Sequence, residues 1–144
     1  MVWGVFMKTP LLLLATLALV SLSSGCALTA EKNNKNIAAA AAWLQANDKG
    51  PAKTNFEGVY YSPDWGTVTL NQRDDKITGA IAHFQVKGFA TGKSAYLLLV
   101  DDGWTEHTMI LKRKSSEIVD GSYSSYIPFS TKDALPVHLD KIVY

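Results

Sequence analysis

The residues around the single cysteine give the clearest indication of a chemical reaction in this chain. Cys26 directly follows Leu22-Ser23-Ser24-Gly25 and is the only cysteine among the 144 residues, so it has no disulfide partner within the chain. Small residues before it allow an extended backbone to enter a peptidase cleft, and a thiolate is the nucleophile that an alkylating lipid donor requires. The stretch therefore predicts cleavage between Gly25 and Cys26 and lipidation of Cys26.

The residues before this stretch have the order of a signal peptide. Lys8 precedes a run of 12 almost entirely apolar residues, Leu11 to Leu22. A helix needs about 20 residues to span a bilayer, so this run is too short to remain as an anchor. A charged start, a short apolar core and small residues at its end are typical of a secretory signal. The first six residues are apolar, so we expect translation to start at Met7.

Together these residues resemble the lipobox of bacterial lipoproteins, in which the cysteine receives a diacylglyceryl group and signal peptidase II cuts before it. The resemblance covers Ser24, Gly25 and Cys26, whereas Ser23 stands where the family prefers leucine. It implies a covalent diacylglyceryl group, and a palmitate-type N-acyl chain, on Cys26 as the new N-terminus. The alternative is an ordinary signal peptide followed by a chance or buried free cysteine.

The lipoprotein interpretation also predicts where the protein is held. It implies a bacterial envelope protein anchored to the membrane by lipid, with the lipoprotein processing and sorting machinery as partners. Ala27 stands where retained lipoproteins carry aspartate, so a Gram-negative source would imply the outer membrane. Residues 26–36 comprise the lipidated cysteine and a segment with one sizeable apolar side chain, Leu28, which predicts an unstructured tether.

Length and charge limit the function classes of the mature chain. Without residues 1–25 it has 119 residues, which suffices for one domain, and it carries 13 basic and 13 acidic side chains. A neutral protein lacks the basic surface that nucleic-acid binding needs, so we expect no nucleic-acid partner.

Residues 37–55 predict a short helix and a linker. Asn36 precedes an alanine-rich segment ending near Ala46, which indicates a helix with Asn36 as its N-cap. Gly50 and Pro51 end it. Because an isolated helix of about ten residues is marginal in water, we expect Trp43 to pack on something. We favour a role in capping one end of the following domain over a second membrane contact.

Residues 56–144 predict an all-β domain. Apolar residues alternate with polar ones in segments such as 67–71, and turn residues separate the segments, which indicates seven or eight short antiparallel strands. Residues 95–100 are apolar on both faces and should form the most buried strand. Phe84 falls on the opposite parity from Ile77, so we expect a bulge or bend near Ala82-His83. Sequential strands favour a small meander barrel over an open sandwich.

Neither catalytic nor metal-binding spacing is present. His83, His107 and His138 lie far apart in the sequence, and no serine occurs in a Gly-x-Ser-x-Gly motif. His107, with Glu106 and the two aspartates before it, is the densest polar cluster, and a solvated hairpin end explains it best. We therefore expect no enzyme activity, no metal and no cofactor other than the covalent lipid.

Aromatic residues near strand ends are the candidates for ligand binding. Tyr60, Trp65, Tyr96 and Trp104 could gather at a barrel mouth around an apolar ligand, although core filling is the commoner role of such residues. Residues 58–79 resemble the opening hairpin of avidin-type barrels, but Ser62 replaces the biotin-binding asparagine. Biotin binding is therefore not expected.

The sequence thus predicts a non-enzymatic binding barrel on a lipid anchor, with two kinds of partner open. One is a small apolar or amphipathic ligand in the barrel. The other is an envelope protein, contacted by an interaction or inhibitor module. Residues 91–96 resemble the Ser-Gly-x-x-Tyr loop of lysozyme inhibitors, whose paired cysteines this chain lacks. A small hydrolase is the third hypothesis.

Overall fold

The computed structural model describes residues 36–144. The predicted signal peptide, the cleavage and lipidation sites at Gly25 and Cys26, and most of the tether lie outside the described residues. No helix within residues 36–144 has the length and apolar character needed to cross a bilayer. Residues 36–47 are helical and are followed by the segment 48–57. Asn36 is itself helical, so the prediction that it is the N-cap is wrong.

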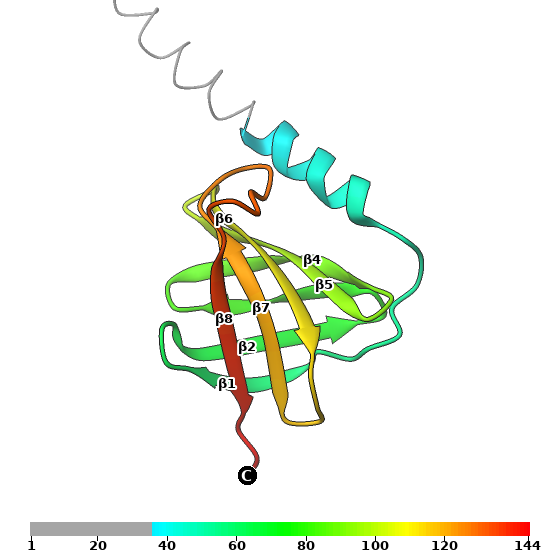
Figure 1. Cartoon of the computed structure of the whole chain (residues 1–144), viewed down its shortest axis with the longest axis vertical. Coiled ribbons are helices and arrows are strands. Elements are labelled where there is room, and N and C mark those ends of the chain that lie inside the picture. Colours follow the sequence, from blue (N-terminus) through cyan, green and yellow to red (C-terminus); the bar gives the residue numbers. More distant parts are fainter. Residues whose placement is uncertain (1–35) are drawn as a thin grey trace, which may run out of the picture. The chain divides into compact units, whose positions relative to one another are not determined.

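The rest of the described chain is a closed antiparallel barrel of eight strands, each paired with its sequence neighbours and β1 with β8 (Figure 1). The strands are β1 (Gly58–Ser62), β2 (Gly66–Arg73), β3 (Lys76–Ile81), β4 (Phe84–Thr91), β5 (Ser94–Asp101), β6 (Trp104–Arg113), β7 (Ile118–Ser124) and β8 (Leu135–Lys141). The prediction of a small all-β meander barrel is confirmed.

Alternation along each strand fills the barrel with apolar side chains. Successive residues of a strand point to opposite faces, so every second residue faces inward. Val68 and Leu70 of β2, Leu97 and Leu99 of β5, and Leu139 of β8 are at most 1% exposed. Together with the other inward residues they form one continuous core.

Glycines lie opposite leucines inside this core. Gly79 pairs with Leu70 and Gly121 with Leu111. A Cβ on Gly79 would lie 1.9 Å from the carbonyl oxygen of Thr69, and its φ is +147°, so this position requires glycine. A small inward residue thus lets the neighbouring backbone approach while the leucine opposite fills the space.

Two irregularities set the faces of the strands. The bend expected near Ala82-His83 is a hairpin turn, with Ile81 paired to Phe84, which places Phe84 in the core. The bulge lies elsewhere, at the shift of register between Leu99 and Val100 where β5 pairs with β6. The sequence carries no composition signal for it, because the residues that it involves are compatible with a regular strand.

The helical residues 36–47 cover the outer wall of the barrel. Ala40 and Trp43 are buried with Leu98 and Val100 of β5 in a second apolar cluster, outside the barrel. Trp43 also stacks on Phe129, with ring centroids 6.2 Å apart. Trp43 therefore packs as expected, but on the wall of the barrel and not as a cap on one end. This cover explains why β5 is apolar on both faces.

Four connections meet at each end of the barrel, and we name the ends by them. The mouth carries the β1–β2, β3–β4 and β5–β6 turns and the loop 125–134. The base carries the β2–β3, β4–β5 and β6–β7 turns together with the segment 48–57. That segment is fastened there because Lys53 N–H donates to Gly92 O at 2.7 Å and Phe56 N–H to Gln72 Oε1 at 2.8 Å.

Replacing the tryptophan under the helix should destabilise the whole domain. Trp43→Ala removes a side chain that is 9% exposed, and large-to-alanine changes at buried aromatic sites cost about 3 kcal/mol or more. Ile37→Ala on the same helix is the control, because Ile37 is 50% exposed and should change the free energy of unfolding by about 0.5 kcal/mol or less. Urea unfolding of the full chain measures both, and equal effects would contradict the packing.

Candidate functional site at the mouth of the barrel

Four rings from four elements meet at the mouth. Trp65 ends the β1–β2 turn, Phe84 opens β4, His107 lies in β6 and Tyr123 in β7. The imidazole of His107 is nearly perpendicular to the other three rings, with centroids 5.7 Å from Trp65, 5.2 Å from Phe84 and 5.7 Å from Tyr123. Edge-to-face contacts of this kind stabilise aromatic groups. We call these four residues the mouth cluster.

Burial controls the protonation of His107. The apolar rings around it disfavour the charged imidazolium, which lowers the pKa of His107 below its usual value, while Glu106 opposes this effect and His83 adds to it. His107 Nδ1 also lies 3.2 Å from Ser125 Oγ. Burial at the edge of the core therefore favours the neutral form of the ring.

A second histidine lies on the solvent side of the mouth cluster. The ring of His83 is tilted over that of Phe84 with centroids 3.9 Å apart. Its Nε2 is 3.7 Å from Asp101 Oδ2, and both side chains are more than half exposed. His83 and Asp101 thus form a weakly coupled polar edge beside the aromatic cluster.

The mouth cluster contains one unsatisfied donor. The indole Nε1 of Trp65 is buried and has no hydrogen-bond partner among the described residues. Leaving such a donor unpaired costs about 1–3 kcal/mol, so an acceptor at this position would be stabilising. The mouth cluster could therefore bind a group that offers a hydrogen-bond acceptor to this indole N–H.

Of the four aromatic residues proposed for ligand binding, the structure places only Trp65 in the mouth cluster. Tyr60 is fully buried near the base, where its hydroxyl donates to Phe56 O at 2.7 Å. Tyr96 lies on the outer wall, 5.7 Å from the ring of Trp43. Trp104 is half-buried in the β5–β6 hairpin and takes no part in the ring contacts of the mouth cluster.

Sequence analysis missed the convergence of the cluster. The sequence places His107 among acidic neighbours, whereas in the structure its partners are aromatic rings. It also predicts Phe84 as a core residue, which is confirmed, but indicates no contact with His107. The sequence does indicate that Trp65, Phe84 and Tyr123 lie at strand ends. Only the strand pairing of the barrel shows that these ends lie together at the mouth.

The third histidine lies on the outer wall between two carboxylates. His138 Nδ1 is 2.6 Å from Asp120 Oδ1, and Nε2 is 3.1 Å from Asp140 Oδ1. The hydrogen bond to Asp120 above all raises the pKa of His138, opposed by its slight burial and assisted by Asp140. With both ring nitrogens used, this cluster is an ion-pair network, and no group of three or more potential ligands within residues 36–144 could hold a metal.

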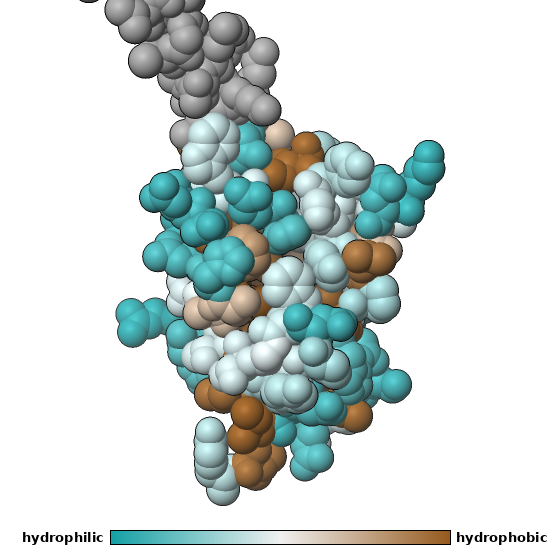
Figure 2. Space-filling view, turned by 90° about the vertical axis from the view of Figure 1, so that its left-hand side faces the viewer, coloured by the Kyte–Doolittle hydropathy of each residue, from teal (hydrophilic) through white to brown (hydrophobic). Residues whose placement is uncertain are grey.

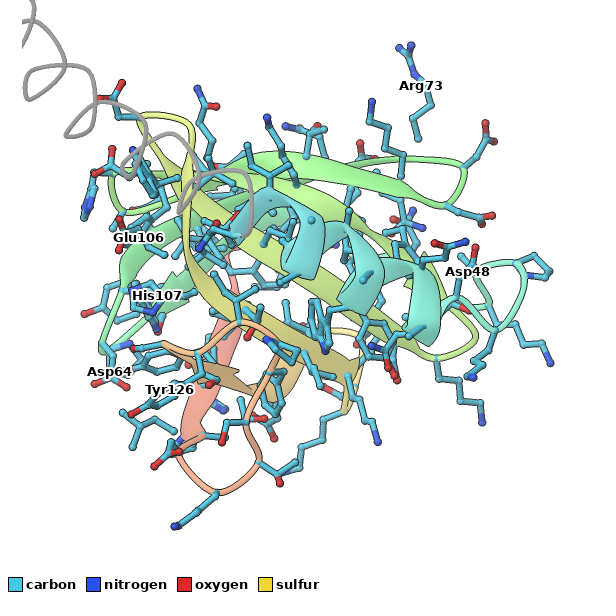
Figure 3. All side chains as sticks on the ribbon, turned by 90° about the horizontal axis from the view of Figure 1, so that it is seen from above. Asp48, Asp64, Arg73, Glu106, His107 and Tyr126 are labelled. Atoms are coloured by element: carbon cyan, nitrogen blue, oxygen red, sulfur yellow. The ribbon has the colours of Figure 1, made fainter. Side chains whose placement is uncertain are left out.

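Charged and aromatic side chains surround the mouth. Figure 3 shows His107 on the same side of the molecule as Asp64, Glu106 and Tyr126, with Arg73 on the opposite side. Tyr126 is 57% and Leu135 54% exposed. On the face in Figure 2, hydrophilic and intermediate residues predominate and hydrophobic ones form small separate patches. The mouth is thus a mixed surface with isolated apolar side chains.

Comparison with known proteins found no matching family model, no matching curated protein and no matching solved structure.

The two perturbed histidines should titrate on opposite sides of their usual pKa of about 6.5. His107 favours the neutral form in the folded chain, so its contribution to stability is complete above about pH 6.5 and is lost as the pH falls through its lowered pKa. His138 favours the charged form, so its contribution is complete below about pH 6.5 and is lost as the pH rises through its raised pKa.

An NMR titration of the imidazole resonances measures this order directly. Asp120→Asn should move the pKa of His138 down and leave His107 unchanged, which provides the control. A pKa of His107 above that of His138 would contradict the geometry of both sites.

Proposed function

We propose that this chain is a lipid-anchored protein of the bacterial envelope whose barrel is a non-enzymatic binding module for another envelope protein. The lipobox-like residues Leu22 to Cys26 support the anchor and the location. The proposal extends to the outer membrane for a Gram-negative source, because Ala27 does not match the retention signal.

The filled interior of the barrel is the observation that supports a binding partner on its outer surface. A pocket for a drug-sized ligand occupies about 300–1,000 Å³. Here the inward positions hold large side chains such as Leu97, Met109 and Leu111, all fully buried. A partner is therefore better accommodated on the outside than within the barrel, which favours a protein over an enclosed apolar ligand.

The mouth is the preferred contact surface. Exposed Tyr126 and Leu135 lie beside the mouth cluster, and tyrosine is enriched at interfaces because it combines apolar area with a polar tip. Rigid aromatic anchors next to a polar rim are the usual composition of a protein contact. Asp64 and Glu106 at the same side supply that rim.

A small ligand at the mouth is the second candidate, favoured by the unpaired indole N–H of Trp65. Such a ligand would offer a hydrogen-bond acceptor to Nε1. Native mass spectrometry separates the two: a copurifying small molecule that Trp65→Phe removes would replace the protein partner as the leading candidate.

The anchor is tested by replacing its nucleophile. Cys26→Ser should abolish labelling by a fatty-acid probe and release the chain from the membrane fraction, because a hydroxyl cannot replace the thiolate as acceptor. Ser23→Leu is the matched control: it introduces the residue that the lipobox prefers and should leave labelling intact. Labelling that persists in the Cys26→Ser chain would disprove lipidation at this residue.

The contact surface is tested by site-specific photo-cross-linking in intact cells. A photoreactive amino acid at Tyr126 should give a cross-link to one defined envelope protein, because this exposed side chain lies at the mouth. The same probe at Arg73, on the opposite side (Figure 3), is the control and should not give that product. Equal products from both positions, or none from Tyr126, would contradict a partner at the mouth.

A further inference from the structure

The base of the barrel contains a polar hollow with three cationic side chains among the seven residues that line it. It is an open surface hollow of about 400 Å³. Lys53 of the segment 48–57, Arg113 at the end of β6 and Lys141 at the end of β8 line it, and Glu57 is the one acidic residue of its lining. The other lining residues are Thr54, Asn55 and Ser116.

The guanidinium of Arg113 is held in place by hydrogen bonds to uncharged oxygens. Its Nε donates to Asn55 O at 3.1 Å, its Nη1 to Ser116 O at 2.9 Å, and its Nη2 to Tyr60 Oη at 3.2 Å. Further bonds from Nη1 and Nη2 go to carbonyl oxygens as well. The five N–H donors of the guanidinium therefore meet oxygens without formal charge, and its positive charge is held in place at the base.

The two lysines near Arg113, Lys53 and Lys141, belong to segments whose backbones are hydrogen-bonded at the base of the barrel. Lys141 N–H donates to Glu117 O and Lys53 N–H to Gly92 O, both at 2.7 Å. The Lys141 stem passes over Gly58, where a Cβ would lie only 2.9 Å from Lys141 Cε. The ion pairs formed within residues 36–144 involve none of Lys53, Arg113 and Lys141.

We propose that this hollow binds an anionic group with carboxylate or phosphate oxygens. Three cations face one carboxylate in its lining, so the hollow attracts anions, and the Thr54 and Ser116 hydroxyls and the Asn55 amide can donate hydrogen bonds to the same oxygens. The site lies at the base, at the opposite end from the mouth, and does not depend on the partner proposed there.

The test compares two double variants that remove the same charge. Lys53→Met with Lys141→Met keeps the lysine-like stems and removes two cations of the hollow. Lys87→Met with Lys132→Met removes two exposed cations elsewhere, one on β4 and one in the loop 125–134. Spectra of the folded state confirm that each variant is intact.

Binding is measured with the full chain in neutral detergent at about 0.15 M salt, where charges further apart than about 8 Å are screened. Labelled poly-L-glutamate, labelled polyphosphate and mixed micelles of the same detergent with phosphatidylglycerol serve as probes for a carboxylate polymer, a free phosphate chain and a lipid headgroup. We expect at least one probe to bind, with roughly a fivefold loss for the Lys53/Lys141 variant and less than twofold for the control.

The probe that shows this difference identifies the source of the anion. Absence of binding by all three probes would overturn the proposal. Equal losses in the two double variants would also overturn it, because they would show attraction to overall charge and not to the hollow. Loss of lipidation or of the mouth partner would leave these outcomes unchanged, so failure of the proposed function is distinguishable.

Discussion

Closure of the barrel is the constraint on which the other features depend. A short antiparallel sheet can close only if neighbouring backbones bend toward each other, and inward glycines permit this. A Cβ on Gly121 would lie 2.0 Å from Ile110 O, so the carbonyl occupies the space of the missing side chain. Leu111, directly opposite, fills the interior that the glycine leaves. Closure also pairs β1 with β8 and removes the exposed edges of an open sheet.

A closed barrel filled with apolar side chains has no room for polar groups in the middle of its interior, so inward polar side chains lie at its ends. The inward positions of β6 show this along one strand: His107 lies at the mouth, Met109 and Leu111 are fully buried, and Arg113 lies at the base. Burial among the rings lowers the pKa of His107, whereas the guanidinium of Arg113 lies among carbonyl and hydroxyl oxygens beside an open hollow. The same alternation that builds the core therefore gives the two ends opposite characters, one aromatic and one cationic.

The fold was predictable because its signals are local. Alternation and turn residues indicate the strands without any information on distant contacts. The site was less predictable. Alternation along a strand predicts which face a residue occupies, but not at which end of the barrel it lies or what packs on the outer face. Tyr60 and Tyr96 could both be placed near strand ends, yet one is buried near the base and the other packs under the helix.

The helical segment links the predicted anchor to the barrel. Asn36 Nδ2 donates to Thr105 O beside the β5–β6 turn at the mouth, and Lys49 N–H donates to Thr91 Oγ1 at the base, so residues 36–49 run along the wall from mouth to base. A lipid on Cys26 would thus be joined to the domain at the mouth, through ten residues that reach at most roughly 33 Å. The apolar outer face of β5 is explained by the packing of Ala40 and Trp43 on Leu98 and Val100.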